Sequence, residues 1–185
     1  MIYVIDHEDS FTYNLVHLLE GFAPTYVSNY YDINWHQLEK SKIIIFSPGP
    51  GNPSHYPETQ KVYKKYKGDK KIIGICLGFQ QILYAENADI VPQKKIYHGY
   101  QSKVKVLKVS ALFKPNKVFL TGRYHSLKLK EPFNSSSLKI SMRCVESNVA
   151  MAIEDTINNV YGFQFHPDSF LTVDGKFLIQ KVLQL

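Results

Sequence analysis

The chain has 185 residues, of which 44% are hydrophobic and 21% charged, and its formal net charge is +6. This length can bury a sizeable core in one domain spanning residues 1–185, and the composition excludes a disordered or fibrous protein. The basic residues are mostly scattered lysines, densest at 61–71, and a solvated helix face explains them better than a nucleic-acid partner does.

The cysteines and the apolar runs bear on the compartment. Cys76 and Cys144 do not form a CxxC pair, so we expect no metal site. A disulfide between them is possible, but nothing points to an oxidising compartment. The opening MIYVIDHEDS does not resemble a signal peptide, and no apolar run approaches the roughly 20 residues of a membrane helix. We expect a cytoplasmic protein without a membrane partner.

The first half of the chain alternates strand and helix signals. We expect strands at 2–6, 42–47 and 70–75, and helices starting at Asp9 or Ser10, over 58–66 and near Leu77. The first helix is expected to carry Phe11, Leu15, Leu18 and Leu19 on one face. Such alternation predicts a parallel sheet covered by helices on both faces.

The second half is richer in strand signals. Expected strands cover 102–109, 117–122, 138–143, 149–155 and 160–166, and a closing helix fits 173–184. The whole pattern predicts an α/β fold with a mostly parallel open sheet, flanking helices and an antiparallel extension.

A cysteine stands where the third expected strand turns into a helix, in the stretch GICLG at 74–78. This is the form glycine, any residue, nucleophile, any residue, glycine, in which a sharp turn exposes the nucleophile and glycines allow close approach of neighbouring chain. A helix start favours a thiolate, and the N–H after the nucleophile can face an oxyanion. A buried cysteine that only packs would not explain the two glycines, so we predict that Cys76 is a nucleophile.

A cysteine nucleophile needs a base and a group that orients the base. His166 ends the apolar strand VYGFQF, and Asp168 follows two residues later. The proline between them ends the strand, which puts His166 at the sheet edge where ligand sites of α/β proteins form. His125 and His98 are rivals on chemistry alone.

A proline- and glycine-rich loop, SPGPGNP at 47–53, follows the second expected strand. Its backbone N–H groups can face an anion or a carbonyl oxygen. The loop lacks the G-K-[ST] ending of a Walker motif, so a nucleotide phosphate is not the expected ligand.

Six stretches occur in the order seen in class I glutamine amidotransferases, which the chain therefore resembles over nearly its whole length. They are DSFTYNL (9–15), SPGPGNP (47–53), GICLGFQ (74–80), HG (98–99), RYHSL (123–127) and GFQFHPDS (162–169). DSFTYNL is similar to one branch, the small subunits of anthranilate synthase and aminodeoxychorismate synthase. The resemblance implies a flavodoxin-like core.

The resemblance also implies roles for particular residues. Cys76 would attack the side-chain amide of L-glutamine, His166 would shuttle protons, and Asp168 would orient His166. The positions matching the glutamine site are Gly49, Pro50, Gly51, Leu77, Gln80, Ser126 and Leu127, of which Gly51 and Leu77 would supply oxyanion-hole N–H groups. The implied partner is a chorismate-using synthase large subunit, which would carry Mg²⁺, while this chain would need no cofactor.

Three positions depart from the family pattern. Asp168 stands where the family usually has glutamate, which shortens the reach to His166 by one methylene. Phe79 replaces a usual histidine, which we interpret as a packing residue and not a catalytic one. Tyr100 replaces a usual lysine in a loop that tends to face the partner.

Other functions remain open at this point. The product of the partner could be 2-aminobenzoate for tryptophan or 4-aminobenzoate for folate. The alternatives are a glutaminase subunit of another synthase such as GMP synthetase, a stand-alone cysteine hydrolase of γ-glutamyl substrates, and a non-catalytic regulatory subunit. The stretch DSFTYNL argues against a subunit of GMP synthetase. Gln80 and RYHSL argue against a stand-alone hydrolase, which would not need them. The presence of Cys76 and His166 argues against a non-catalytic regulatory subunit.

Overall fold

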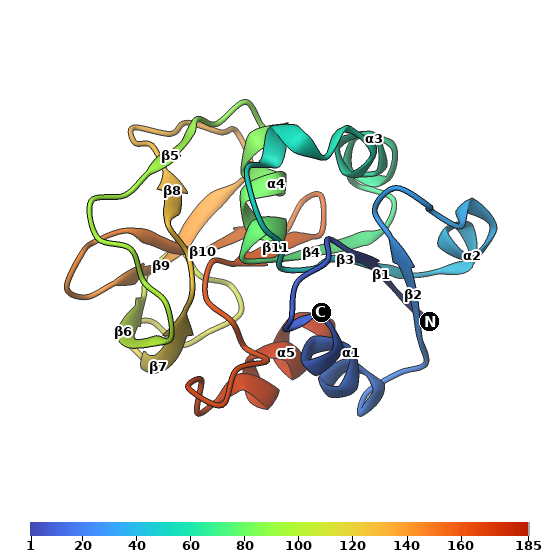
Figure 1. Ribbon diagram of the computed structural model, residues 1–185. Coiled ribbons are helices and arrows are strands. Elements are labelled where there is room, and N and C mark those ends of the chain that lie inside the picture. Colours follow the sequence, from blue (N-terminus) through green and yellow to red (C-terminus); the bar gives the residue numbers. More distant parts are fainter. Residues whose placement is uncertain (185) are drawn as a thin grey trace.

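The computed structural model describes residues 1–184, which form a nine-stranded sheet flanked by helices and a separate two-stranded sheet beside one of those helices (Figure 1). The large sheet contains β1 (Ile2–Asp6), β2 (Thr25–Asn29), β3 (Ile43–Phe46), β4 (Lys71–Ile75), β6 (Tyr100–Val106), β7 (Val118–Arg123), β9 (Lys139–Cys144), β10 (Ala150–Asp155) and β11 (Val160–Phe163). The small sheet pairs β5 (Ile90–Pro92) with β8 (Leu127–Leu129). The helices are α1 (Thr12–Glu20), α2 (Trp35–Lys40), α3 (Pro57–Tyr66), α4 (Leu77–Ala85), α5 (Gly175–Leu183) and a 3₁₀ turn at Pro53–His55.

The strand order is β2-β1-β3-β4-β11-β10-β9-β6-β7. The first five strands in this order are mutually parallel, and the pairs from β11–β10 through β6–β7 are antiparallel. The structure thus confirms the predicted α/β fold with its antiparallel extension. It also puts β11, from the last part of the chain, in the middle of the sheet.

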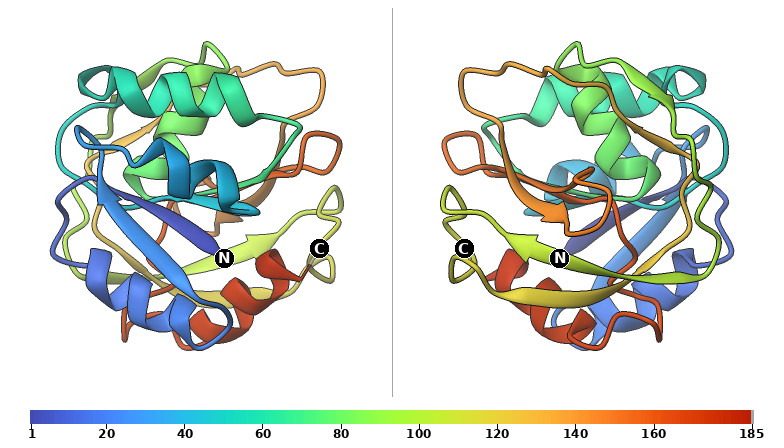
Figure 2. Two further views of the ribbon diagram at one scale, coloured as in Figure 1. Left: turned by 90° about the vertical axis from the view of Figure 1, so that its right-hand side faces the viewer. Right: turned by 90° about the vertical axis from the view of Figure 1, so that its left-hand side faces the viewer.

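Helices cover both faces of the sheet, as Figure 2 shows from two sides. α1 and α5 lie on one face and α2, α3 and α4 on the other. Strand side chains alternate between these layers: Ile2 and Val4 join the cluster under α1 and α5, whereas Tyr3 and Ile5 join the cluster under α2 to α4. Both clusters are built from continuous apolar runs, as expected for parallel strands buried on two faces.

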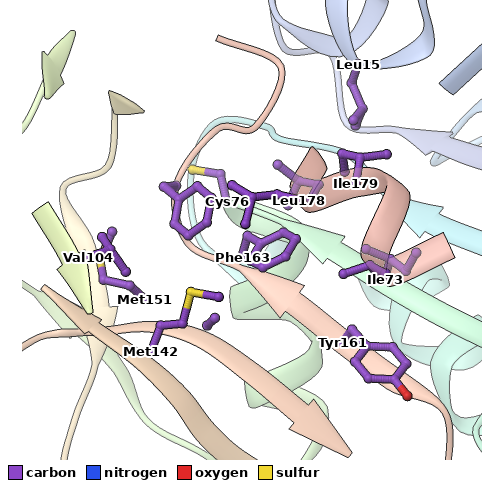
Figure 3. Packing of buried hydrophobic residues seen from close by; sticks show 14 of the residues in the cluster. Leu15, Ile73, Cys76, Val104, Met142, Met151, Tyr161, Phe163, Leu178 and Ile179 are labelled. Carbon is purple, nitrogen blue, oxygen red and sulfur yellow. The ribbon is translucent and has the colours of Figure 1, made fainter. Parts of the chain in front are cut away.

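The cluster under α1 and α5 supports the end of β4. Figure 3 shows Cys76 at its margin, near Phe163 and Leu178. Phe163 is 2% exposed and Leu178 is fully buried, and full burial of such a side chain stabilises the fold by about 1.5–3 kcal/mol. Cys76 is therefore mounted on rigid packing rather than on a mobile loop.

Several elements differ from the sequence-based expectation. The expected cap at Asp9 or Ser10 is wrong: α1 begins at Thr12 after Phe11, whose side chain makes no capping bond. Asp9 instead accepts a hydrogen bond from the Phe11 N–H at 2.8 Å. The last strand stops at Phe163 rather than 166, and α5 begins at Gly175 rather than 173.

The described part of the chain also bears on the cysteines and on metal and membrane binding. Cys76 and Cys144 are free and buried, so they form no disulfide with each other. Among residues 1–184, no helix has the length and apolar character needed to cross a bilayer. Within the same range, no group of three or more histidine, cysteine or acidic residues has a metal-binding arrangement.

Candidate active site

Three neighbouring parallel strands deliver the candidate residues to one edge of the sheet. Phe46 at the end of β3 lies opposite Gly74 of β4, and Ile75 lies opposite Phe163 of β11. The glycine-rich loop follows β3, Cys76 follows β4, and His166 comes three residues after β11. Because parallel strands end at the same edge, residues far apart in sequence meet there.

Cys76 occupies the sharp turn between β4 and α4. Its backbone angles are φ 53° and ψ −100°, a conformation that a residue with a side chain adopts only when its surroundings enforce it. Its N–H donates to the Phe163 carbonyl at 2.8 Å, and its own carbonyl accepts from the Gln80 N–H at 3.2 Å. The thiol thus stands at the N-terminus of α4, where the helix dipole favours a thiolate.

The glycines on either side of Cys76 allow the turn to pack closely. A Cβ at Gly74 would lie 2.3 Å from the Gly78 carbonyl oxygen, and a Cβ at Gly78 would lie 2.1 Å from the Phe46 carbonyl oxygen. Both atoms belong to the backbone and cannot rotate away. The turn therefore requires glycine at both positions.

Gly78→Ala should destabilise the protein by at least about 2–3 kcal/mol, because the added methyl forces α4 away from β3. Urea unfolding followed by circular dichroism measures the change. Gly21→Ala is the matched control, since a Cβ there approaches only the Leu18 carbonyl oxygen, at 3.3 Å. Equal stability of the two variants would contradict this account of the turn.

His166 is the histidine that is coupled to Cys76. It is 1% exposed, and although burial lowers its pKa, the charge of Cys76, with help from Asp168, raises the pKa to about 10. A histidine with this pKa is an imidazolium at neutral pH. His166 therefore holds a proton before any substrate arrives.

Asp168 faces the other nitrogen of His166 at a longer distance than a hydrogen bond. His166 Nδ1 and Asp168 Oδ2 are 3.6 Å apart, and the aspartate side chain is fully buried. Among residues 1–184, neither carboxylate oxygen nor the Nδ1 has a hydrogen-bond partner. The carboxylate therefore faces the imidazole without a hydrogen bond of ordinary length.

Aromatic rings hold His166 where the carboxylate does not. The rings of Phe11 and Tyr124 lie edge-on to His166, with centroids 5.0 and 4.9 Å from it. The Tyr124 hydroxyl is 2.9 Å from Ser169 Oγ. The backbone N–H of His166 donates to the Gly122 carbonyl at 3.0 Å. The imidazole is thus oriented by ring contacts and by its backbone.

Two cavities meet at Cys76. The smaller, of about 210 Å³, contains all the residues predicted for glutamine together with the nucleophile. These are Gly49, Pro50, Gly51, Cys76, Leu77, Gln80, Ser126 and Leu127. The larger cavity, of about 500 Å³, is lined by His166, Phe11, Phe170 and Leu171 among others. Its lining is more apolar, so the two openings to the thiol differ in character.

Sequence reasoning missed three residues of the site. Asp9 and Tyr124 line both cavities. Gln164 is fully buried, and its amide N–H₂ lies 3.8 Å from the Cys76 sulfur while its oxygen accepts from Gln80 at 3.1 Å. All three lie in the family-like stretches DSFTYNL, RYHSL and GFQFHPDS. Membership in these stretches was the sequence feature that could have identified them as site residues.

The rival histidines occupy other positions. His125 accepts a hydrogen bond from Arg123 Nε at 3.0 Å, so its Nδ1 carries the proton and donates to the Leu127 carbonyl at 2.8 Å. Burial and the Arg123 charge lower its pKa to about 3, so it remains neutral and supports the cavity wall. His98 is exposed and lines only the larger cavity among those described.

A strained cysteine at a strand-to-helix turn, beside a histidine that follows the neighbouring strand, is an arrangement typical of α/β enzymes that use a cysteine nucleophile. The family model described as "Glutamine amidotransferase class-I" matches residues 3–185. The chain therefore belongs to the class I glutamine amidotransferase family.

Individual proteins agree with this assignment. The chain is 36% identical over 183 residues to "Anthranilate synthase component 2" of Lactococcus lactis subsp. lactis (strain IL1403), covering 97% of this chain and 92% of that protein. It is 34% identical to the protein of the same name from Cyanidium caldarium, covering 100% and 98%. The crystal structure of a glutamine amidotransferase from Thermotoga maritima has the same fold, with a TM-score of 0.76 at 14% identity, over 99% of this chain and 96% of that one.

Proposed function

We propose that this chain is the glutaminase subunit of an aminobenzoate-forming synthase, and that it passes ammonia to a chorismate-using partner subunit. The observation that carries the proposal is the meeting of Cys76 and a protonated His166 with a small polar cavity at the end of β4. The relatives named anthranilate synthase component 2 support this branch of the family. We place the protein in the cytoplasm, where thiols such as Cys76 stay reduced.

The reaction begins when the Cys76 thiolate attacks the side-chain carbonyl carbon of glutamine. The carbonyl oxygen becomes an oxyanion, which the backbone N–H groups of Gly51 and Leu77 stabilise, each contributing about 3–4 kcal/mol. His166 gives its proton to the departing nitrogen, and ammonia leaves a γ-glutamyl thioester. His166 then takes a proton from a water molecule, the resulting hydroxide attacks the thioester carbon, and Cys76 leaves as the thiolate while glutamate is released. Splitting the reaction in two makes a poorly electrophilic amide reactive.

In this mechanism the larger cavity is the exit for ammonia. It shares Asp9, Gly49, Cys76 and Tyr124 with the glutamine cavity and opens past apolar side chains. Ammonia released into neutral water becomes ammonium, which is not a nucleophile, so it must pass directly to the enzyme that uses it. The chemistry in this chain needs no cofactor, and Mg²⁺ is expected on the partner.

The mouth of the larger cavity is the proposed docking face for the synthase subunit. Phe170 lines this cavity and is 88% exposed. A large exposed aromatic side chain is the kind of residue that dominates binding energy when a partner covers it. His98 and Gly99 line the same mouth, so Tyr100, which the structure places in strand β6 rather than in the expected loop, is near the proposed interface.

Phe170→Asp should weaken the complex with the synthase subunit roughly tenfold or more, because it puts a charge in an apolar contact. Isothermal titration calorimetry measures the affinity. Ile157→Asp is the matched control, since Ile157 is 80% exposed in the turn between β10 and β11. An unchanged affinity for the Phe170 variant would place the interface elsewhere.

The direct test of the function is to supply glutamine, chorismate and Mg²⁺ to this protein and the chorismate-using subunit of the same cell. Formation of 2-aminobenzoate places the protein in tryptophan synthesis, and the names of its relatives favour that result. Formation of 4-amino-4-deoxychorismate or 4-aminobenzoate places it in folate synthesis. Product from ammonium salts but never from glutamine would overturn the proposal.

A further inference from the structure

The loop that supplies Gly51 is held by two groups with no part in the mechanism above. Pro50 is followed by Gly51 at φ +75°, which suits the two central residues of a type II turn. Type I and type II turns differ in the orientation of the amide between these residues. That amide contains the Pro50 carbonyl and the Gly51 N–H, so its orientation decides where the N–H points.

The Tyr56 hydroxyl fixes this amide. It donates a hydrogen bond to the Pro50 carbonyl oxygen at 2.7 Å. In a trans peptide the carbonyl and the N–H point in opposite directions, so holding the Pro50 oxygen on one side directs the Gly51 N–H to the other. Both residues line the glutamine cavity. One hydroxyl therefore selects the orientation of a proposed oxyanion donor.

The Tyr56 ring is itself held in place. It is 6% exposed and lies edge-on to His7 and Tyr30, with centroid distances of 4.9 and 4.7 Å. Burial raises the pKa of Tyr56, so the hydroxyl keeps its proton and remains a donor at neutral pH.

A second brace reaches the other end of the loop. Ser47 Oγ donates to the Pro48 carbonyl at 2.6 Å, so it accepts from His7 Nδ1 at 3.2 Å. His7 Nε2 then accepts from the Thr59 hydroxyl of α3 at 2.9 Å. Burial lowers the pKa of His7 to about 3, which keeps this chain of hydrogen bonds intact across the neutral range. The loop is anchored to α3 through the Pro48 carbonyl and to Tyr56 through the Pro50 carbonyl.

We propose that Tyr56 is a positioning residue for the amidotransferase reaction: its hydroxyl holds the Pro50–Gly51 amide so that the Gly51 N–H faces the oxyanion. The inference rests on the proposed role of the Gly51 N–H. Tyr56 does not itself line the glutamine cavity, so it acts through the loop and not on the substrate.

The test compares Tyr56→Phe with Tyr66→Phe in glutamate release from L-glutamine, measured with the synthase subunit present. Tyr66→Phe is the matched control. It removes an equivalent hydrogen bond away from the site, from the Tyr66 hydroxyl to Glu39 Oε1 at 2.7 Å. We expect Tyr56→Phe to lower kcat at least about tenfold, since losing a whole oxyanion donor costs about 10²–10³. KM should change less than about twofold, because the hydroxyl does not bind the ground state.

Two further readouts separate positioning from a loosened fold. Alkylation of Cys76 by iodoacetamide forms no oxyanion, so its rate should equal that of the unmodified protein. The γ-aldehyde analogue of glutamine forms a tetrahedral adduct with a thiol, and its affinity should fall by the same factor as kcat. Equal kcat values for the two variants, or alkylation that falls with kcat, would overturn the inference. Failure of the nucleophile assignment appears separately, as activity in a Cys76→Ser variant.

Discussion

Cys76→Ser should lower glutamine hydrolysis by at least about a thousandfold, as removal of a covalent nucleophile does in other enzymes. A serine hydroxyl is a much weaker acid than a thiol, so the variant lacks an anionic nucleophile beside His166. In complex with the synthase subunit, synthesis from ammonium salts should continue, because ammonia bypasses the thiol. Glutamate release and aminobenzoate formation, assayed in parallel, measure the two effects.

Cys144→Ser is the matched control for this experiment. Cys144 is 1% exposed, and its thiol donates to Glu146 at 3.1 Å. It lines neither of the two cavities that meet at Cys76. Its serine variant should keep glutamine hydrolysis close to that of the unmodified protein. Full glutamine-dependent synthesis by the Cys76 variant would show that another group is the nucleophile.

His166→Gln should lower kcat by roughly 10²–10⁴, the usual contribution of a general acid and base. The sign of the pH effect follows from the raised pKa. His166 is protonated below about 10, and the departing nitrogen needs that proton, so the rate should decline as the pH passes through this value. The His166→Gln variant has no titrating group at position 166, so its residual rate should lack this alkaline decline. A pH–rate profile from 6 to about 11 measures both effects.

Two other variants sharpen the interpretation. His17→Gln changes an exposed histidine of α1 and should leave the profile unchanged. Asp168→Asn keeps the shape of the side chain and removes the charge that helps to raise the pKa of His166, so the alkaline decline should move to lower pH. A decline that persists in the His166 variant would assign it to another group.

The sequence predicted the elements that carry strong apolar runs and missed the weak ones. The runs at 2–6, 43–46 and 71–75 are buried on both faces, and each was recognised. β2 was missed because TYVSN is only half-buried at the edge of the sheet, and α2 because six residues give too little helical periodicity. The strands β5 and β8 have three residues each. They form because they pair with each other, and three residues are too few to show a local strand pattern in the sequence.

The site was predicted residue by residue where motifs named the residues, and their geometry came only from the structure. A cysteine between two glycines at a strand end indicates a turn, and the turn is there with φ +53°. The 3.6 Å gap between His166 and Asp168 depends on backbone positions that no motif contains. Gln164 was missed because its role depends on the pairing of β11 with β4.

The pairing of β4 with β11 also determines when the chain becomes active while the ribosome is making it. The ribosome makes the strand before Cys76 long before it makes the strand before His166. The two residues meet only after the chain up to His166 has left the exit tunnel and β11 has entered the sheet. Insertion of a late strand between β4 and β10 is a long-range event, slow compared with local helix formation. A nascent chain therefore carries a thiol without its proton donor, and ammonia production begins only when the sheet is complete.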